Sequence, residues 1–423
     1  MKNAISVFVH AVAGLAMLFI ISLGAGRFAM AQQEKVLHSF IDNGIDGYYP
    51  VTNLGISDNL VGTTSAGGSS GLGTVFRVNT ENGDEAVIHN FSGGSDGADP
   101  TGALGYYIPD GTYPANYGTT SSGGANNLGT VYLLAIIGSG GAGGGMPPGS
   151  KVYEGVKYSF DGKHGANPYG GLSGGPDANL FGTTVYGGAY NMGTVFQFTH
   201  KTHRFWEVHV LHNFGNSSTD GFYPYATLIP DAAGNLYGTT PQGGANSFGT
   251  VFEMVQKTGG GWAEKVLYSF NSKPDGNTPY ASLIFDTSGN LYGTTFYGGT
   301  FGYGTVFELM PAGGGSWTET VIHDFDNNGT DGALPFAGLS FDSSGNLYGT
   351  TELGGTAGFG TVFELTPAGG GSWTETVLHS FANTPDGSDP IGGVSIDTST
   401  GIIYGTTEEG GDYGYGTVYK IMP

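Results

Sequence analysis

The chain of 423 residues contains no cysteine and few charged side chains. The absence of cysteine excludes disulfides, thiolate metal sites and a lipid anchor on an N-terminal cysteine. Lysine and arginine together number 13 against 35 aspartate and glutamate residues, which gives a formal net charge of −22. A surface this acidic repels nucleic acid and anionic lipid, so we expect neither as a partner.

Glycine and aromatic residues are abundant instead. The chain has 81 glycines, without the three-residue period of collagen, together with 26 phenylalanines and 25 tyrosines. The hydrophobic share of 38 % argues against a disordered chain. Aromatic and β-branched residues combined with turn formers favour an all-β protein.

The first 31 residues are typical of an export signal. Lys2 precedes an apolar run at 4–25, and Ala29-Met30-Ala31 supplies a cleavage pattern of small residues. We therefore expect residues 1–31 to be a signal peptide and the protein to be secreted, periplasmic or on the cell surface. The apolar run is also long enough for an uncleaved anchor, which is the alternative, and no later segment is apolar enough to span a bilayer.

Nearly all of the remaining chain is a repeat. A tetrapeptide ending in Gly-Thr-Thr occurs seven times, and its glycine is followed 11 residues later by Gly-Thr-Val-aromatic. The seven tetrapeptides that end in Gly-Thr-Thr start at Val61, Tyr117, Phe181, Tyr237, Tyr292, Tyr348 and Tyr404. Successive copies lie 55 to 64 residues apart. A period of this length indicates one supersecondary unit repeated seven times.

Residues 317–365 give the strand pattern of one copy. Aromatic and β-branched segments predict four short strands, at 317–325, 335–341, 347–351 and 360–365. Four antiparallel strands per copy are typical of a propeller blade. The sequence therefore predicts an all-β, seven-bladed β-propeller of four-stranded antiparallel blades, forming a single domain at 32–423.

The order of the strands also predicts how the ring closes. The repeat begins with the strand that ends at Phe40 and stops after a Gly-Thr-Val strand at 416–422. If the phenylalanine-ending strand is outermost, the last blade lacks its outer strand, and the N-terminal strand supplies it. Such a closure pairs an otherwise open sheet edge.

These copies resemble the GloVer tandem-repeat proteins, exported bacterial proteins with a Tyr-Gly-Thr-Thr-x-x-Gly-Gly-x4-Gly-Thr-Val-Phe core. Residues 292–307 and 348–363 match that core at every defined position. The resemblance covers about residues 34–422. It implies no established activity, no cofactor and no catalytic residues.

Asp-Gly loops recur between the blades. They hold Asp46, Asp96, Asp220, Asp275, Asp331 and Asp386, with His164 in blade three. A ring of carboxylates would bind calcium, but the better explanation is that each Asp caps its turn while the next Gly takes a positive φ. His38, His89, His212, His323 and His379 share one position with Tyr158 and Tyr268. This interchange favours a hydrogen-bonding position, so we expect no metal site there.

Function should lie where the copies differ, since residues present in every copy serve the scaffold. The differences cluster after Thr-Thr, on a face that propellers use for ligands. The candidate ligand-binding residues are Tyr186, Tyr190, Phe296, Tyr297, Phe301, Glu352, Glu408, Glu409, Asp412 and Tyr413. Aromatic faces beside carboxylates suit sugar rings, which stack on aromatics and donate hydroxyl hydrogen bonds.

Three functions remain open from the sequence. The first is a monomeric binding or interaction module for a glycan or a surface protein, with no catalytic residue. The second is a carbohydrate-active enzyme, either a hydrolase or a lyase, using the carboxylates Glu352, Glu408, Glu409 and Asp412 of blades six and seven. The third is a scaffold without a small ligand.

Overall fold

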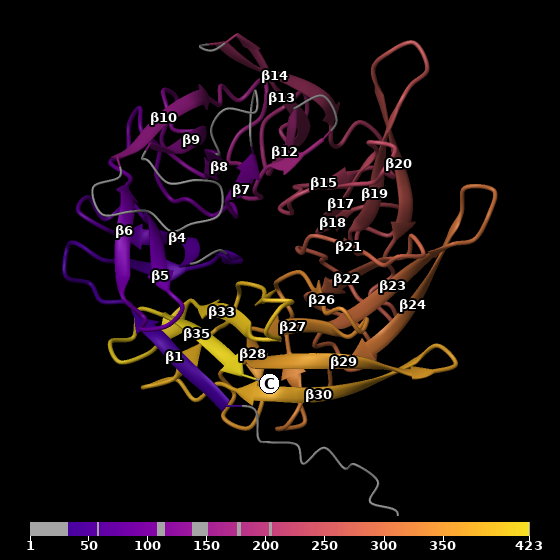
Figure 1. Cartoon of the computed structure of the whole chain (residues 1–423). Coiled ribbons are helices and arrows are strands. Elements are labelled where there is room, and N and C mark those ends of the chain that lie inside the picture. Colours follow the sequence, from indigo (N-terminus) through magenta and orange to yellow (C-terminus); the bar gives the residue numbers. More distant parts are fainter. Residues whose placement is uncertain are drawn as a thin grey trace, which may run out of the picture.

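The computed structural model describes residues 33–56, 59–107, 115–137, 151–175, 179–202 and 205–422. Within these residues the protein is a ring of seven antiparallel blades, in which no helix occurs. Figure 1 shows the blades around a central axis. The predicted seven-bladed β-propeller is confirmed. Since the described part has no helix, it has none that is long and apolar enough to cross a membrane. The predicted signal peptide lies outside the described residues.

Each blade has four strands, and the blades are numbered 1 to 7 in chain order. The innermost strands are β3 (Gly55–Ile56), β7 (Gly105–Tyr107), β11 (Ser173–Gly174), β16 (Ile229–Pro230), β21 (Ile284–Phe285), β26 (Ser340–Phe341) and β32 (Ser395–Ile396). The second strands carry Gly-Thr-Thr and are β4 (Asn59–Gly67), β8 (Ala115–Thr120), β12 (Leu180–Thr184), β17 (Leu236–Thr240), β22 (Leu291–Thr295), β27 (Leu347–Thr351) and β33 (Ile403–Thr407).

The third strands carry the Thr-Val-aromatic sequence, and the fourth strands form the outer edge. The third strands are β5 (Thr74–Asn79), β9 (Thr130–Ile137), β13 (Thr194–Thr202), β19 (Thr250–Gln256), β23 (Thr305–Pro311), β29 (Thr361–Gly369) and β35 (Thr417–Met422). The outer strands are β6 (Glu85–Asn90), β10 (Lys151–Ser159), β14 (Phe205–Asn213), β20 (Trp262–Ser269), β24 (Trp317–Asp324), β30 (Ser372–Ser380) and β1 (Gln33–Ser39).

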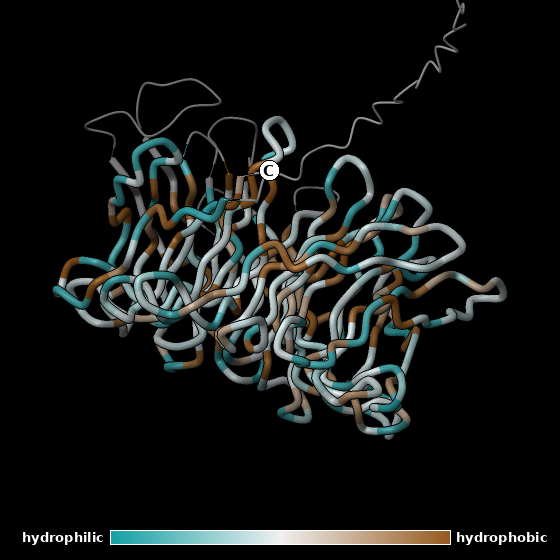
Figure 2. Tube along the Cα trace, turned by 90° about the horizontal axis from the view of Figure 1, so that it is seen from below, coloured by the Kyte–Doolittle hydropathy of each residue, from teal (hydrophilic) through white to brown (hydrophobic). Residues whose placement is uncertain are grey.

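Short strands join the Asp-Gly loop of a blade to its Gly-Gly loop, which is the loop with a Gly-Gly pair between the second and third strands. They are β2 (Gly47–Pro50), which pairs with β4, and the pairs β15 (Gly221–Phe222) with β18 (Gln242–Gly243), β25 (Gly332–Ala333) with β28 (Leu353–Gly354), and β31 (Gly387–Ser388) with β34 (Glu409–Gly410). The two kinds of loop therefore lie on one face of the ring. Figure 2 shows hydrophilic loops on both faces of the disc.

The first described strand lies in the last blade. β1 pairs antiparallel with β35, from Gln33 opposite Met422 to Ser39 opposite Thr417. Figure 1 shows indigo β1 beside yellow β35. Phe40 follows β1 and is fully buried, in a cluster that joins Val418 of blade 7 to Phe76 of blade 1. This pairing leaves no exposed edge on β35.

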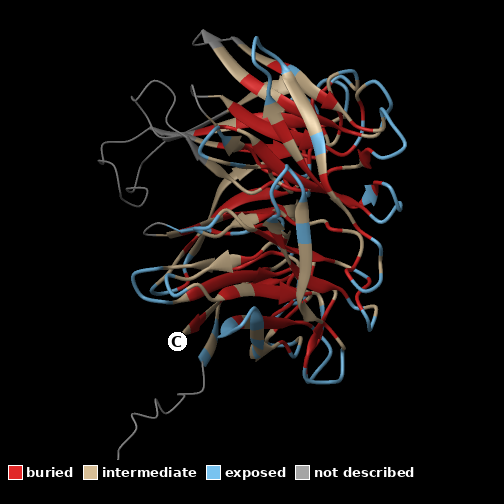
Figure 3. Ribbon diagram, turned by 90° about the vertical axis from the view of Figure 1, so that its right-hand side faces the viewer, coloured by how far each residue is buried: buried red, intermediate tan, exposed pale blue. Residues whose placement is uncertain are grey.

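The hydrophobic core lies between neighbouring blades. One cluster joins Tyr292 and Val306 of blade 5 to Leu347 and Phe363 of blade 6, and equivalent clusters recur around the ring. Figure 3 shows that the buried residues form the middle of the disc, while exposed residues lie mainly in the loops. Each blade therefore buries both of its faces against its neighbours.

The glycine of Gly-Thr-Thr is required for space. A Cβ atom on Gly349 would lie 2.6 Å from Cζ of Phe363 and 2.9 Å from Cδ2 of Leu339. Equivalent close approaches occur at the six other copies, where the aromatic residue is Phe or Tyr. The aromatic ring of the third strand therefore packs directly on the backbone of the second, which explains why the two motifs occur together.

The two threonines have different partners. The second, Thr351, hydrogen-bonds through Oγ1 to Oγ1 of Thr361 on the next strand, at 2.8 Å. The first, Thr350, donates through Oγ1 to the carbonyl of Gly392 in the following blade, at 3.0 Å. Thr406 makes the same kind of bond to the Thr52 carbonyl, from blade 7 to blade 1. One threonine thus stabilises the blade and the other joins it to its neighbour.

The innermost strands are much shorter than the sequence predicted. The predicted strand 335–341 contains only β26, Ser340–Phe341. Pro335 has no N–H to donate, and the carbonyl of Ala337 accepts a hydrogen bond from Thr294 Oγ1 of the preceding blade. Contacts between blades therefore replace the sheet ladder close to the axis.

Candidate functional site

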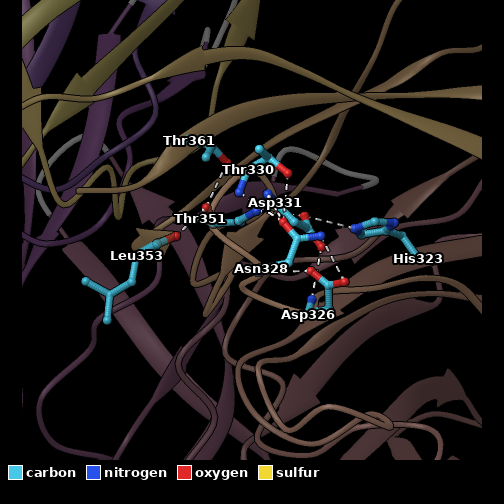
Figure 4. A network of polar contacts seen from close by, with 9 residues as sticks. His323, Asp326, Asn328, Thr330, Asp331, Thr351, Leu353 and Thr361 are labelled. Carbon is cyan, nitrogen blue, oxygen red and sulfur yellow. Dashed lines mark hydrogen bonds and ion pairs between the residues drawn. The ribbon is translucent and has the colours of Figure 1, made fainter. Parts of the chain in front are cut away.

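The aspartates of the Asp-Gly loops cap their own turns, as the sequence predicted. Asp331 Oδ2 accepts the N–H of Asp326 at 3.0 Å, and Oδ1 accepts the N–H of Gly332 at 2.7 Å. His323 Nε2 lies 3.3 Å from Oδ1 of the same aspartate, as Figure 4 shows. In blade 4, Tyr268 takes the place of the histidine and donates to Asp275 Oδ2 at 2.6 Å. The hydrogen-bonding role predicted for the His/Tyr position is confirmed.

The backbone conformation of the glycine after each capping aspartate differs from the prediction. Of the six glycines, only Gly97 and Gly276 have a positive φ. At Gly332 a Cβ atom would lie 2.4 Å from Oγ1 of Thr351, and similar approaches occur in the other blades. The position is therefore glycine because the buried threonine pair leaves no room, and a positive φ is not the general reason.

Each copy has a proline ahead of its innermost strand, called here the repeat proline: Pro50, Pro100, Pro168, Pro224, Pro279, Pro335 and Pro390. The residue before it holds the axial end of the blade, which is the end near the central axis on the face with the Asp-Gly loops. All seven have a left-handed φ between 50° and 65°: Tyr49, Asp99, Asn167, Tyr223, Thr278, Leu334 and Asp389. Leu334 donates its N–H to the Tyr303 carbonyl of blade 5 and accepts the N–H of Glu352 in blade 6, at 2.8 and 3.0 Å. This strained conformation joins two blades, and it fixes the backbone of the first variable residue after Thr-Thr.

The residue after the proline forms an arc of aromatic rings around the axis. In blades 3 to 6 these residues are Tyr169, Tyr225, Tyr280 and Phe336, and neighbouring ring centroids are 5.0, 5.1 and 5.1 Å apart. A regular ring of seven points spaced by 5.1 Å has a radius of about 6 Å, so these four aromatic rings lie close to the central axis. We call these four residues the aromatic arc. Sequence reasoning missed them, because they fell in a predicted inner strand.

Three candidate residues extend the aromatic arc. Phe296 lies 5.7 Å from Tyr280 and 5.8 Å from Phe336, and Tyr297 packs on Phe296 at 4.5 Å. Tyr297 is 47 % exposed. Tyr186, which is also exposed, contacts Tyr223 at 5.4 Å. A partly exposed aromatic surface therefore covers this side of the axial end.

The three tyrosines of the aromatic arc keep their phenol protons. Burial raises the pKa of Tyr225 to about 12, and the nearby Tyr186 and Tyr280 add to the rise. Burial also raises the pKa of Tyr169 and of Tyr280 above the ordinary value. Their hydroxyl groups are therefore neutral and can donate or accept hydrogen bonds.

Carboxyl groups of blades 6 and 7 gather at the other side of the axial end. Burial raises the pKa of Glu408 to about 7, and the charges of Glu409, Asp389 and Glu352 add to the rise. Burial raises the pKa of Asp389 above its ordinary value, and the nearby Glu409 adds to the rise. We call these four residues the acidic group. Asp389 was not among the predicted residues.

Four predicted residues lie away from the axis, on loop tips that lean toward the outer strands. Tyr190, Phe301, Asp412 and Tyr413 occupy equivalent loops. The N–H of Thr300, next to Phe301, donates to Asp324 of the outer strand β24 at 2.9 Å. The N–H of Asp412 donates to Ser39 of β1 at 3.3 Å.

Asp412 and Tyr413 instead line a cavity of 640 Å³ at the outer edge of the ring. The cavity is bounded by β1 and by Pro385 and Asp386 of the loop before blade 7. Six of the ten predicted residues therefore lie in two groups, three in the aromatic surface and three in the acidic group. Asp412 is not among the charges that act on Glu408. The sequence could not give the direction in which each loop tip points.

Comparison with solved structures shows the propeller fold in unrelated sequences. An ancestral GH74 enzyme matches with a TM-score of 0.58 and 12 % identity, over 92 % of this chain and 51 % of that one. The chain thus spans about half the length of that enzyme. Oligogalacturonate lyase from Vibrio parahaemolyticus matches with a TM-score of 0.51 and 10 % identity, over 93 % and 97 % of the two chains. At such identities the likeness concerns the fold alone.

The sequence itself matches one repeat family. No curated protein matches the chain. The Gloeobacter/Verrucomicrobia repeat matches at residues 138–340 and 316–423, which together cover more than half of the chain. This agrees with the resemblance drawn from the Gly-Thr-Thr and Gly-Thr-Val motifs. The chain belongs to the Gloeobacter/Verrucomicrobia repeat family.

Proposed function

We propose that the protein is an exported binding module that holds a neutral glycan at the axial end of the ring, on the face with the Gly-Gly loops. One observation carries the proposal: the aromatic arc and the acidic group lie at the same end of the axis, since Leu334, two residues before Phe336, is hydrogen-bonded to the backbone of Glu352. Aromatic faces accept the apolar face of a sugar ring, and carboxylates accept hydrogen bonds from its hydroxyl groups.

The composition of this end differs from that of the scaffold. Residues present in every copy are used for packing, whereas the position after the proline is aromatic in blades 3 to 6 and is Val51, Thr101 or Ile391 in the others. An arc that covers part of the ring makes the end asymmetric, with a stacking side and an accepting side. Such asymmetry supports one orientation of a bound ligand.

Charge supports the choice of a neutral glycan. The net charge of −22 and the acidic group disfavour uronates and sulfated sugars, which would bring further negative charge. A neutral oligosaccharide avoids this repulsion and can donate hydroxyl hydrogen bonds to Glu352 and Glu408. A surface protein as the ligand is the competing outcome of the test below.

The test is a glycan array probed with the purified protein, followed by calorimetric titration of any glycan that binds. Tyr225→Ala and Tyr280→Ala should each weaken binding about tenfold or more, which corresponds to 1.4 kcal/mol. Phe301→Ala is the matched control, because Phe301 is 56 % exposed on a loop tip away from the axis. Absence of any bound glycan, or equal losses in all three variants, would overturn the proposal.

A hydrolase acting at the same place is the second candidate. The observation that favours it is Glu408, whose pKa of about 7 would leave about half of the molecules protonated at pH 7, so that the group could act as a general acid. Release of reducing sugar from a bound glycan, lost in Glu408→Gln while binding remains, would support the enzyme. A glycan that binds and is not cleaved between pH 4 and 9 would exclude it.

A further inference from the structure

The seams between blades hold a second set of chemical groups, at the outer edge of the ring. A histidine from one outer strand, the capping aspartate of the next loop and a glutamate from the following outer strand meet there. Four such clusters occur in the described part of the chain: His212 with Asp220 and Glu264, His323 with Asp331 and Glu375, His379 with Asp386 and Glu34, and His38 with Asp46 and Glu85. In each, one potential ligand atom per residue lies within 4.8 Å of the other two.

The clusters contain buried oxygen atoms without hydrogen-bond partners. Oε1 of all four glutamates is buried and has none. Asp46 is only 5 % exposed, yet its Oδ1 also has no partner, while Oδ2 lies 3.1 Å from Nε2 of His38. Burying such an oxygen without a partner is costly, and a ligand that met it would offset that cost.

The charge at the clusters also favours a bound cation. Two carboxyl groups and one imidazole face one another at each of the four seams. A divalent cation would offset the negative charge of the two carboxylates.

We propose that these four seams are metal sites, in which a zinc ion joins neighbouring blades through one imidazole and two carboxylates. Nitrogen and oxygen ligands in this ratio suit zinc better than calcium, which prefers oxygen alone. Two ligand atoms of a tetrahedral zinc ion lie about 3.4 Å apart. The histidine and aspartate atoms are already close to this separation, as His38 Nε2 and Asp46 Oδ2 are at 3.1 Å, so the glutamate carboxylate would move toward them by up to about 1.4 Å. This inference is independent of the proposed glycan site.

Ions and water can reach at least one cluster from solvent. Glu34 and Asp386 line the 640 Å³ cavity at the outer edge of blades 6 and 7, together with Asp412. The histidines His38, His323 and His379 have 18 to 20 % of their side chains exposed. Water could therefore complete the coordination of an ion held by three side chains.

The seam between blades 4 and 5 provides a natural control. There Tyr268 replaces the histidine and donates to Asp275, while Glu319 again has a buried, unpartnered Oε1. Burial and the hydrogen bond to Asp275 raise the pKa of Tyr268, so the phenol stays protonated and is a poor ligand. This seam should hold no zinc, although both of its carboxyl groups are present.

The experiment counts zinc on chelator-stripped protein after addition of ZnCl₂ and gel filtration, by mass spectrometry of the metal. We expect at least four ions per chain, one fewer in His323→Tyr, and one more in Tyr268→His. Both variants install a residue that already occupies the equivalent position in another blade, so folding should be preserved. Glu375→Gln should also lose one ion, whereas Glu319→Gln should lose none.

Two results would overturn the proposal. One is a wild-type protein that keeps no zinc after gel filtration. The other is a zinc count that is the same in His323→Tyr, Tyr268→His and the wild type, because this would mean that the ions are held by the acidic surface in general. Competition with an excess of calcium should leave the count unchanged, and full displacement by calcium would contradict the mixed imidazole and carboxylate ligand set.

Discussion

Glu319 on β24 is a half-buried carboxyl group that the protein holds at a cost in stability. Its Oε1 has no hydrogen-bond partner, and burial raises its pKa to about 8, with a further contribution from the charge of Asp275. Tyr268, the third polar group at this seam, stays neutral. Because the pKa is raised on folding, the contribution of Glu319 is fully present below about pH 4.5 and is lost as the pH rises through 8.

Replacing Glu319 by glutamine keeps the shape of the side chain and removes the charge. A rise of about 3.5 pKa units would correspond to about 4.8 kcal/mol, but the side chain is partly exposed and solvent screens it, so we expect about 1 kcal/mol. Glu319→Gln should therefore match the wild type at pH 4.5 and exceed it at pH 9. For a chain of this length, the gain at pH 9 corresponds to about 1–3 °C in melting temperature.

The assay is thermal unfolding at both pH values, with a chelator present. The control is Glu81→Gln, because Glu81 is exposed in the hairpin before β6. It should not change the melting temperature by more than a fraction of a degree at either pH. An equal effect of Glu319→Gln at pH 4.5 and pH 9, or a loss of stability at pH 9, would refute the reasoning about the buried charge.

Three further predictions concern the scaffold. Gly349→Ala should cost about 1–3 kcal/mol in unfolding free energy, because its Cβ would press on the Phe363 ring, whereas Gly174→Ala has open space and should cost little; equal costs would contradict this packing. Thr350→Val should cost about 1–2 kcal/mol in denaturant unfolding by removing the bond to the next blade, and an unchanged midpoint would contradict it. Deleting residues 33–41 should expose the edge of β35 and cause aggregation in light scattering, and a soluble monomer with unchanged melting would contradict the closure.

The fold was predictable because the same local rules are repeated seven times. Each copy contains strand-forming residues, turn formers and the Gly-Thr-Thr motif at nearly constant spacing. Seven repeats of one pattern do not arise by chance, so the strand prediction for one copy held for all of them. The physical reason for the motif was not visible, since Gly349 and Phe363 lie on separate strands and meet only through their register. The inner strands were overestimated because the sequence did not show that blade-to-blade bonds replace the ladder near the axis.

The candidate site was predictable only in part. The rule that function lies where copies differ selected the pair after Thr-Thr, and the structure groups six of those residues at the axial end. The same rule, applied after the proline, would have found Tyr169, Tyr225, Tyr280 and Phe336. Their contact depends on the convergence of four blades, which no single repeat contains.

The seam clusters were also missed, for a related reason. Histidine and aspartate belong to one blade and its following loop, so their pairing could be inferred from one copy. The glutamate lies four residues before the histidine of the next copy, as Glu375 does before His379. Its approach to His323 exists only after two blades have packed.

The most direct test of the proposed function is a crystal structure of the protein with a bound oligosaccharide. The account predicts a sugar ring stacked on Tyr225 or Tyr280, with hydroxyl groups within hydrogen-bond distance of Glu352 or Glu408. A ligand bound only at the outer cavity near Tyr413, with the aromatic arc free, would contradict it.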